Sequence, residues 1–218
     1  MSGGGPTVDE AAFWEGLYER GGDRWELGRA TPPLAEYLER TRPPGEKVAV
    51  PGCGRGHDAR LWARSGYRVW GFDFADPAIR DARVLAGREN LDIVFEQRDI
   101  FGLATDYRGF FDGIWEYTCF CAVDPSRRPG YVSLVRQLLK PGGWLLACFF
   151  PVRQGTGGPP FPTTEAEVRR LFTPAFAFLE TYVPENSAEG RREMELMVFA
   201  RVTPSTGARA RAADRGAR

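Results

Sequence analysis

A glycine-rich turn followed by a lone acid is the feature that most constrains the fold of this chain. The turn holds three alternating glycines, Gly52, Gly54 and Gly56. It lies between a predicted strand at 47–50 and a predicted helix at about His57–Ser65, and a second predicted strand then ends on Asp73. Such glycines let a ligand approach the backbone, and such an acid can accept hydrogen bonds from ribose hydroxyls. The segment therefore predicts half of a nucleotide-binding α/β unit, with a purely structural glycine turn as the alternative.

The spacing of the glycines distinguishes between cofactors. A dinucleotide fingerprint reads G-x-G-x-x-G, and its third glycine lets the helix pack close to the strand. Here the pattern is G-x-G-x-G, and no Gly-Lys-Ser/Thr follows that would mark a phosphate-binding P-loop. The shorter pattern suits a cofactor that carries adenosine and an amino acid without a phosphate. S-adenosylmethionine is such a cofactor, and we predict that it binds here.

Composition predicts an ordinary globular protein. The chain has 218 residues, 43% hydrophobic and 27% charged, with equal numbers of acidic and basic side chains, so neither a nucleic-acid nor a membrane partner is expected. No apolar run reaches the roughly 20 residues that span a bilayer, and residues 1–10 lack a signal-peptide pattern. A cytoplasmic location is therefore expected. We predict one domain over residues 1–202 and a disordered basic tail over 203–218.

The four cysteines and the single histidine form no recognisable metal-binding pattern, so no metal is predicted. Cys119 and Cys121 lie two apart on a predicted strand and would face the same side. That placement fits either a position near the substrate or ordinary packing of small side chains.

Strands and helices are predicted to alternate along most of the chain. The predicted strands are 47–50, Tyr67–Phe72, Ile93–Gln97, Phe111–Phe120, Trp144–Phe150, Ala177–Val183 and Met194–Val202. The predicted helices are Glu10–Arg20, one that starts at Pro32 with Thr31 as its cap, His57–Ser65, Asp76–Arg88, Pro125–Lys140 and one from a Thr164 cap to Phe172. Alternating units that end in a hairpin predict an α/β fold, with a seven-stranded, mostly parallel sheet, one antiparallel strand and helices on both faces.

In an open α/β sheet the ligand lies beyond the carboxyl ends of the strands. There Gly52 and Gly54 would let the methionine part of the cofactor pass close to the backbone, and Asp73 would accept hydrogen bonds from both ribose hydroxyls. Asp99 would take the adenine amino group while Ile100 packs against the ring. Each acid alone is as well explained by solvation or helix capping, so the prediction depends on several strand ends agreeing.

Three aromatic residues upstream form a second candidate group. Trp14 and Tyr18 are four residues apart and share a helix face, and Trp25 follows them. An aromatic face over a desolvated sulfonium gains about 0.5–2 kcal/mol of cation–π attraction. The group would then form an aromatic lid over about residues 10–30, whereas spacing alone favours ordinary core packing.

Six segments of the chain resemble the thiopurine S-methyltransferase superfamily, most closely its thiol, thiocyanate and halide methyltransferase branch. They are WELGRATPPL, VPGCGRGHD, GFDFADPAI, EYTCFCAV, LLKPGG and PVRQGTGGPPF. The resemblance implies a class I S-adenosylmethionine-dependent methyltransferase. It also implies cofactor contacts at eight positions, Trp14, Tyr18, Trp25, Gly52, Asp73, Asp99, Ile100 and Tyr117. The family usually has tryptophan where this chain has Tyr18.

The implied reaction is a direct displacement, in which a nucleophile attacks the sulfonium methyl group in line. The expected acceptor is a small soft nucleophile: a thiol, hydrosulfide, a thiopurine, thiocyanate or a halide. A thiolate, hydrosulfide, thiocyanate or iodide is already a potent nucleophile at neutral pH and needs no general base, so positioning and exclusion of water would supply the catalysis. Tyr117 is the predicted catalytic residue, which would orient cofactor or substrate, with Glu116 beside it. Two alternatives stay open: methylation of an oxygen or nitrogen of a larger molecule, and a non-catalytic module that binds S-adenosylmethionine. The expected partner is a small-molecule nucleophile, and the chain is expected to be a monomer or a weak homodimer.

Overall fold

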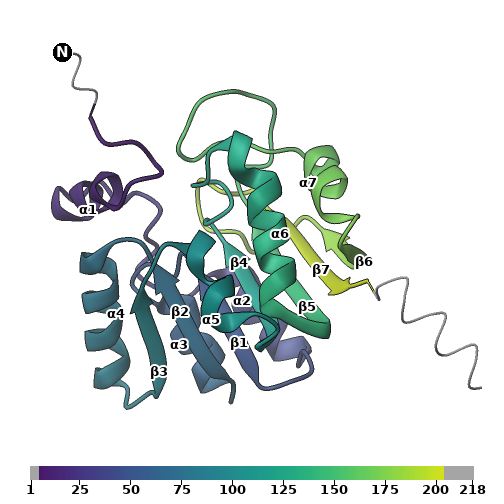
Figure 1. The fold of residues 1–218 in the computed structure, drawn as a ribbon, viewed down its shortest axis with the longest axis horizontal. Helices are drawn as coiled ribbons and strands as arrows, with labels where there is room; N and C mark the ends of the chain where they lie inside the picture. Colours follow the sequence, from purple (N-terminus) through teal and green to yellow (C-terminus); the bar gives the residue numbers. More distant parts are fainter. Residues whose placement is uncertain (1–4, 204–218) are drawn as a thin grey trace, which may run out of the picture.

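The computed structural model describes residues 5–203, whose strands form one seven-stranded sheet (Figure 1). The strands are β1 (Lys47–Pro51), β2 (Arg68–Asp73), β3 (Ile93–Gln97), β4 (Phe111–Tyr117), β5 (Leu139–Phe149), β6 (Phe176–Tyr182) and β7 (Leu196–Val202). They lie in the order β3-β2-β1-β4-β5-β7-β6, and β7 runs antiparallel to both of its neighbours while the other pairs are parallel. The predicted sheet is confirmed.

Helices cover both faces of the sheet, as predicted. They are α1 (Ala11–Glu19), α2 (Pro32–Arg40), α3 (His57–Arg64), α4 (Asp76–Arg88), the short α5 (Ala104–Tyr107), α6 (Arg128–Leu138) and α7 (Glu165–Phe172). Side chains of α2, α3 and α4 pack in one hydrophobic cluster with the strands, and those of α5, α6 and α7 pack in another. Helix α1 stands outside these two layers, next to α4 (Figure 1).

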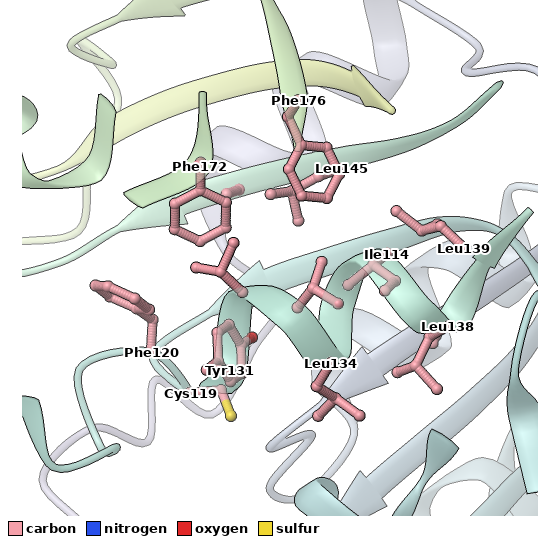
Figure 2. Close-up of a cluster of buried hydrophobic side chains, with 14 of the residues drawn as sticks. Ile114, Cys119, Phe120, Tyr131, Leu134, Leu138, Leu139, Leu145, Phe172 and Phe176 are labelled. Atoms are coloured by element: carbon pink, nitrogen blue, oxygen red, sulfur yellow. The ribbon is translucent and has the colours of Figure 1, made fainter. Parts of the chain in front are cut away.

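Strand β5 shows how one strand serves both layers. Its side chains alternate between the cluster around α2 and α3 (Trp144, Leu146, Cys148) and the cluster around α6 and α7 (Leu145, Ala147, Phe149). A strand buried on both faces is expected to be a continuous apolar run, and residues 144–149 are one. Figure 2 shows the second cluster, to which α6 contributes Tyr131 and Leu134 and α7 contributes Phe172.

The predicted carboxyl end of β4 is wrong. The strand ends at Tyr117 rather than at Phe120, because Thr118 takes a left-handed conformation (φ 62°) that turns the chain out of the sheet. Cys119 and Cys121 therefore lie in a turn after the strand, and the alternation of a strand does not apply to them.

The predicted helix at Pro125–Lys140 is also too long. A 3-10 turn at Pro125–Arg127 precedes α6, which ends at Leu138. The next residue, Leu139, already pairs with Phe111 of β4. Sheet pairing therefore ends the helix before the proline and glycines that were expected to stop it.

The two predicted threonine caps differ. The hydroxyl of Thr164 accepts a hydrogen bond from the Glu167 backbone N–H at 3.1 Å, so this residue caps α7 as predicted. Thr31 does not cap α2, because its hydroxyl donates to the Asp58 carboxylate at 2.7 Å instead. The same carboxylate accepts a hydrogen bond from Trp115 Nε1 at 2.8 Å, so it ties the starts of α2 and α3 to β4.

Within residues 5–203, no helix is both long enough and apolar enough to cross a membrane. The predicted basic tail lies outside the described residues, apart from Thr203.

Candidate active site

A cavity of about 630 Å³ lies at the carboxyl ends of the parallel strands, next to α1. Its lining includes seven of the nine residues predicted to bind the cofactor: Trp14, Tyr18, Trp25, Gly52, Asp73, Asp99 and Ile100. They come from α1, from the segment before α2, and from the ends of β1, β2 and β3. The other two, Gly54 and Tyr117, are not among the lining residues. The fold thus brings distant parts of the sequence to one place.

Asp73 is the last residue of β2, and two backbone N–H groups hold its carboxylate. Oδ2 accepts a hydrogen bond from Gly54 N at 2.8 Å, and Oδ1 accepts one from Ala75 N at 3.0 Å. The residue is 8% exposed, and burial raises the pKa of its carboxyl despite these donors. Each oxygen keeps a free lone pair. The carboxylate can therefore accept hydrogen bonds from hydroxyl groups of a ligand in the cavity.

The glycine turn brings its backbone up to the cavity at Gly52. This residue has a φ of 60°, and a Cβ added to it would lie 2.9 Å from the Cβ of Cys119. Gly54 has a φ of 53°, and a Cβ there would lie 3.2 Å from the Tyr18 hydroxyl. Any larger residue at Gly52 would displace the turn that follows β4. Gly52 therefore contributes backbone, and no side chain, to the wall of the cavity.

Asp99 and Ile100 follow β3 and have different surroundings. The carboxylate of Asp99 is exposed and accepts a hydrogen bond from the Phe101 backbone N–H at 2.9 Å, so it caps a 3-10 turn at Ile100–Gly102. The Ile100 side chain is buried and gives the cavity an apolar wall. Asp99 can cap the turn and bind a ligand at the same time, because only Oδ1 accepts the hydrogen bond from the Phe101 N–H.

The three aromatic residues of the predicted lid pack edge to face. The Trp25 ring lies 5.7 Å from the Trp14 ring and 5.5 Å from the Tyr18 ring, measured between centroids. Tyr18 is buried and packs with Ala75 and Ala78 at the start of α4. The group therefore forms a small hydrophobic cluster and lines the cavity at the same time, so the two interpretations of its spacing are compatible.

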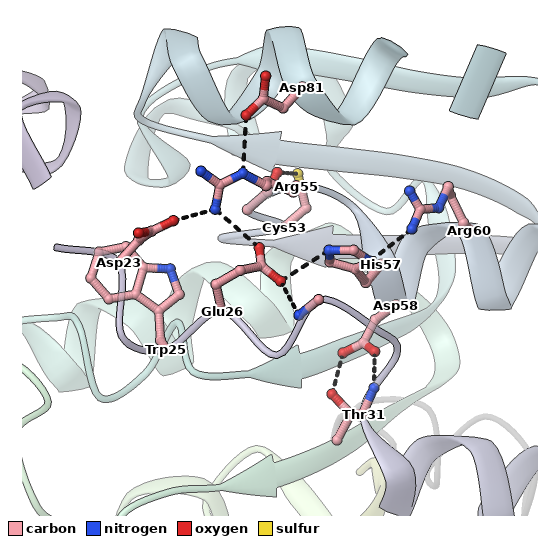
Figure 3. Close-up of polar contacts among 12 residues, drawn as sticks. Asp23, Trp25, Glu26, Thr31, Cys53, Arg55, His57, Asp58, Arg60 and Asp81 are labelled. Carbon is pink, nitrogen blue, oxygen red and sulfur yellow. Dashed lines mark hydrogen bonds and ion pairs between the residues drawn. The ribbon is translucent and has the colours of Figure 1, made fainter. Parts of the chain in front are cut away.

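Four polar side chains fasten this segment to the glycine turn, and we call them the lid clasp: Asp23, Glu26, Arg55 and His57 (Figure 3). The Arg55 guanidinium binds Asp23 and lies 3.4 Å from Glu26 Oε2. His57 Nε2 donates to Glu26 Oε1 at 2.9 Å. The clasp joins the segment before α2 to the loop before α3, across the rim of the cavity.

The contacts of the clasp lower the pKa of the Glu26 carboxyl. Burial by itself would raise the pKa of this carboxyl. Hydrogen bonds from His57 and from the Gly28 N–H, together with Arg55, lower the pKa to about 2 instead. The carboxylate therefore stays charged, and the single histidine of the chain is engaged in structure rather than in the cavity.

Glu116 and Tyr117 were predicted to be the polar groups nearest the transferred methyl group, and neither lines the cavity. Glu116 is buried on the α6 side, where it accepts hydrogen bonds from the Tyr131 hydroxyl and, at 2.7 Å, from the Phe120 N–H. Tyr117 points to the other side, and its hydroxyl donates to Glu195 Oε1 at 2.7 Å and accepts a hydrogen bond from Arg191. Tyr117 is thus one contact away from the cavity wall, through Arg191.

Cys119 and Cys121 both line the cavity. Burial raises the pKa of Cys121 to about 12 and that of Cys119 well above its usual range. Both side chains are therefore thiols rather than thiolates near neutral pH. Nowhere in residues 5–203 do three or more His, Cys, Asp or Glu side chains gather in a way that could hold a metal ion.

Sequence reasoning missed Arg191, which lies between β6 and β7 and contributes a buried guanidinium to the cavity. It also missed Phe150, at the end of β5. The apolar loop 157–161, part of the segment PVRQGTGGPPF, reaches the cavity through Pro159 and Pro160. Nothing in the sequence separates Arg191 from the other charged residues around it, because only the fold turns this one inward.

The comparison with solved structures agrees with this fold. The structure of 1,6-didemethyltoxoflavin-N1-methyltransferase from Burkholderia thailandensis, with bound 1,6-didemethyltoxoflavin and S-adenosylhomocysteine, has a TM-score of 0.73 at 24% sequence identity. The match covers 89% of this chain and 87% of that one. The fold is that of class I methyltransferases, as predicted.

Sequence comparison then gives the family. The model of the thiopurine S-methyltransferase (TPMT) family matches residues 9–201. Probable thiol methyltransferase 2 of Arabidopsis thaliana is 34% identical over 170 residues, which are 77% of this chain and 74% of that protein. Thiocyanate methyltransferase 1 of Brassica oleracea is 31% identical over 183 residues, 83% of this chain and 80% of that one. The chain belongs to the thiopurine S-methyltransferase family and is an S-adenosylmethionine-dependent methyltransferase.

The residues of the cavity fit this cofactor. Asp73 offers a buried carboxylate with free lone pairs, which suits ribose hydroxyls. Gly52 brings its backbone to the cavity wall, which suits a ligand that lies against it. The apolar wall at Ile100 and the aromatic lid suit an adenine ring and a sulfonium.

Proposed function

We propose that this methyltransferase acts on a small soft nucleophile: a thiol, hydrosulfide, a thiopurine, thiocyanate or a halide. The observation that carries the proposal is the Arg191 guanidinium, which is 6% exposed and lines a cavity with mostly apolar walls. A cation held in such surroundings attracts a small anion or thiolate strongly, because little water screens it. The names of the thiol and thiocyanate methyltransferases among the relatives support the same class of acceptor.

When bound, S-adenosylmethionine supplies an electrophilic methyl group on a positively charged sulfur. In the proposed site Asp73 would hold the ribose, Gly52 and Gly54 would flank the amino acid part, and Asp99 with Ile100 would hold the adenine. The lone pair of the nucleophile forms the new bond to the methyl carbon as the sulfur–methyl bond breaks, and the released electron pair stays on that sulfur. An anionic acceptor thereby becomes a neutral methylated product.

The site favours acceptors that need no general base. The Asp73 carboxylate is engaged with two backbone N–H groups, and His57 is engaged in the lid clasp. The raised pKa values of Cys119 and Cys121 keep these side chains protonated, so they are poor bases and poor competitors for the methyl group. We therefore propose that the acceptor arrives as a competent nucleophile, as soft anions do, without the help of the remaining carboxylates of the lining, Asp9, Asp99 and Glu189.

The remaining walls would position the acceptor and exclude water. Trp25, Phe150 and the pair Pro159-Pro160 line the cavity together with Arg191. Alignment of two reactants in such a site contributes several kcal/mol to the lowering of the barrier. We propose that Tyr117 acts through Arg191, as a positioning residue, since its hydroxyl contacts that guanidinium.

The experiment measures release of S-adenosylhomocysteine from S-adenosylmethionine with iodide, thiocyanate, hydrosulfide, a small aromatic thiol and no acceptor in parallel. We expect turnover above the blank with at least one soft nucleophile. In the Arg191→Gln variant, kcat/KM for an anionic acceptor should fall at least about tenfold. The exposed neighbour Arg192 offers a matched control, and Arg192→Gln should retain wild-type activity. If no soft nucleophile reacts while the cofactor still binds, the acceptor is an oxygen or nitrogen of a larger molecule.

A further inference from the structure

Arg191 holds its position at the cavity through neutral partners. Its Nη2 donates to the Trp25 carbonyl oxygen at 2.6 Å, and its Nη1 donates to the Tyr117 hydroxyl. The guanidinium carbon lies 4.9 Å from the Phe150 ring centroid and 5.2 Å from that of Tyr117. Within the described part of the chain, no carboxylate pairs directly with this buried cation.

The charge that balances Arg191 lies one side chain further from the cavity. Glu195, just before β7, is 1% exposed and accepts a hydrogen bond from the Tyr117 hydroxyl at 2.7 Å. Its second oxygen, Oε2, is buried and has no hydrogen-bond partner among the described residues. Burial of an unpaired carboxylate is costly, and the nearest compensation in this network is the guanidinium on the far side of the phenol.

The direction of donation in the two hydrogen bonds that join Arg191, Tyr117 and Glu195 is fixed. A guanidinium can only donate, and a carboxylate can only accept. Tyr117 lies between them, and burial together with the Glu195 charge raises its pKa far above the usual range, so the phenol keeps its proton. The three residues therefore form one polar chain that runs from Arg191 at the cavity wall through Tyr117 to Glu195, which does not line the cavity.

We propose that Glu195 is a specificity-determining residue, which sets how strongly the cavity prefers an anionic acceptor over a neutral one. The inference rests on the proposed function, because it concerns the acceptor of that same reaction. With the carboxylate present, its negative charge offsets part of the field that Arg191 exerts in the cavity. Without that charge, the full field of the guanidinium acts on whatever lies beside it.

The test replaces the charge and keeps the shape. Glu195→Gln retains an oxygen that can accept the Tyr117 hydrogen bond, and it removes a buried carboxylate oxygen that has no partner. Thiocyanate and thiourea form a matched pair of small sulfur ligands, one anionic and one neutral. Each is titrated calorimetrically into wild type and variant saturated with S-adenosylhomocysteine, so the readout is binding and not turnover. The exposed residue of the same segment, Glu185, supplies the control variant Glu185→Gln.

In Glu195→Gln we expect thiocyanate to bind about tenfold more tightly and thiourea to bind within about twofold of wild type. The gain in thiocyanate affinity should vanish when Arg191 is also replaced, so the Arg191→Gln/Glu195→Gln double variant should bind thiocyanate no more tightly than Arg191→Gln. The reason is that Glu195 acts through the guanidinium. Glu185→Gln should match wild type for both ligands.

Equal changes for both ligands in Glu195→Gln, no change, weaker thiocyanate binding, or no measurable binding to any of these proteins would each overturn the inference. The proposed function is judged separately, from methyl transfer to the soft nucleophiles. If none is methylated but Glu195→Gln still gains affinity for thiocyanate alone, the proposed function fails, while the effect of Glu195 on anion binding in the cavity is confirmed. If the soft nucleophiles are methylated and Glu195→Gln does not change the preference for thiocyanate over thiourea, the proposed function holds and the inference fails.

Discussion

The carboxylate of Asp73 accepts a hydrogen bond from the backbone N–H of Gly54 at 2.8 Å. This contact locks the acid at the end of β2 to the glycine turn after β1. Neither partner can move without the other, so contacts to the backbone fix the position of the carboxylate that we propose binds the cofactor. Pre-organisation of this kind lowers the cost of binding, because the group is ordered before the ligand arrives.

The first prediction concerns this carboxylate. Asp73→Asn keeps the size of the side chain but removes the charge and one acceptor oxygen. We expect S-adenosylmethionine to bind about 10- to 100-fold more weakly, as for loss of a charged hydrogen bond. We also expect a loss of about 1–3 kcal/mol of stability, because Asn has one acceptor oxygen for the two backbone N–H groups that Asp73 holds. Calorimetric titration of the cofactor and a thermal melt check both points. The exposed acid Asp92 gives the control Asp92→Asn, and equal affinity in the two variants would remove Asp73 from the cofactor site.

The parts of the fold that the sequence predicts well are those with local causes. Strand β3 and helix α4 have the predicted bounds, because an apolar run and an Asp-Pro helix start are visible in a short window. The glycine turn and Asp73 meet as predicted, because strand ends of a parallel sheet share one edge. The end of β4 was missed, because no sequence rule requires a left-handed conformation at Thr118.

The polar network of the site is less visible in the sequence. Arg55 and Glu26 are separated by nearly thirty positions, and their pairing depends on how the segment before α2 crosses the turn. Arg191 is one of two adjacent arginines, and only the approach of the 183–195 segment to the end of β4 buries this one. A charged residue at a single position produces no periodic pattern in the sequence. Only the tertiary structure therefore shows which charged residues face the cavity or pair with one another.

The second prediction concerns the lid clasp. Arg55→Gln removes the cation that joins Asp23, Glu26 and Asp81. We expect the KM for S-adenosylmethionine to rise about three- to tenfold with a smaller effect on kcat, because the aromatic lid loses its fastening to the turn. The control variant Arg64→Gln removes an exposed ion pair between Arg64, on α3, and Glu89. It should leave the KM for S-adenosylmethionine and kcat unchanged. A fall in kcat alone would contradict a role in holding the lid over the cofactor.

The third prediction concerns the pH dependence of stability at Glu116. This carboxyl is buried, and burial raises its pKa from the ordinary 4.5 to about 7. Because the folded state holds the proton more tightly than the unfolded chain, the associated stabilisation is complete below pH 4.5 and is lost as the pH rises through 7. Relative to Glu116→Gln, wild type should therefore lose about 3 kcal/mol of unfolding free energy between pH 4.5 and 8.

Denaturant unfolding at a series of pH values measures this difference. The exposed acid Glu19 gives a control, and Glu19→Gln should follow the wild-type profile at a constant offset. Parallel profiles for wild type and Glu116→Gln would show that the carboxyl has no raised pKa in the folded protein.

The last prediction concerns Arg128, which braces the apolar loop over the cavity. The residue is 1% exposed, and its guanidinium donates to the carbonyl oxygens of Phe161 and Pro162 at 3.0 and 3.2 Å and to Glu167 Oε1 at 3.0 Å. Arg128→Met removes these bonds and leaves partly buried acceptors unpaired, so we expect a loss of about 1–3 kcal/mol of stability.

The same variant separates the acceptor end of the cavity from the cofactor end. Pro159 and Pro160 line the cavity just before the two braced carbonyls, so a loosened loop should raise the KM for the acceptor more than the KM for S-adenosylmethionine. Steady-state kinetics with each reactant varied in turn measures the two constants. Arg170→Met, on the exposed side of α7, is the control and should alter neither. An equal rise in both constants would mean that Arg128 supports the whole domain rather than the wall that Pro159 and Pro160 form.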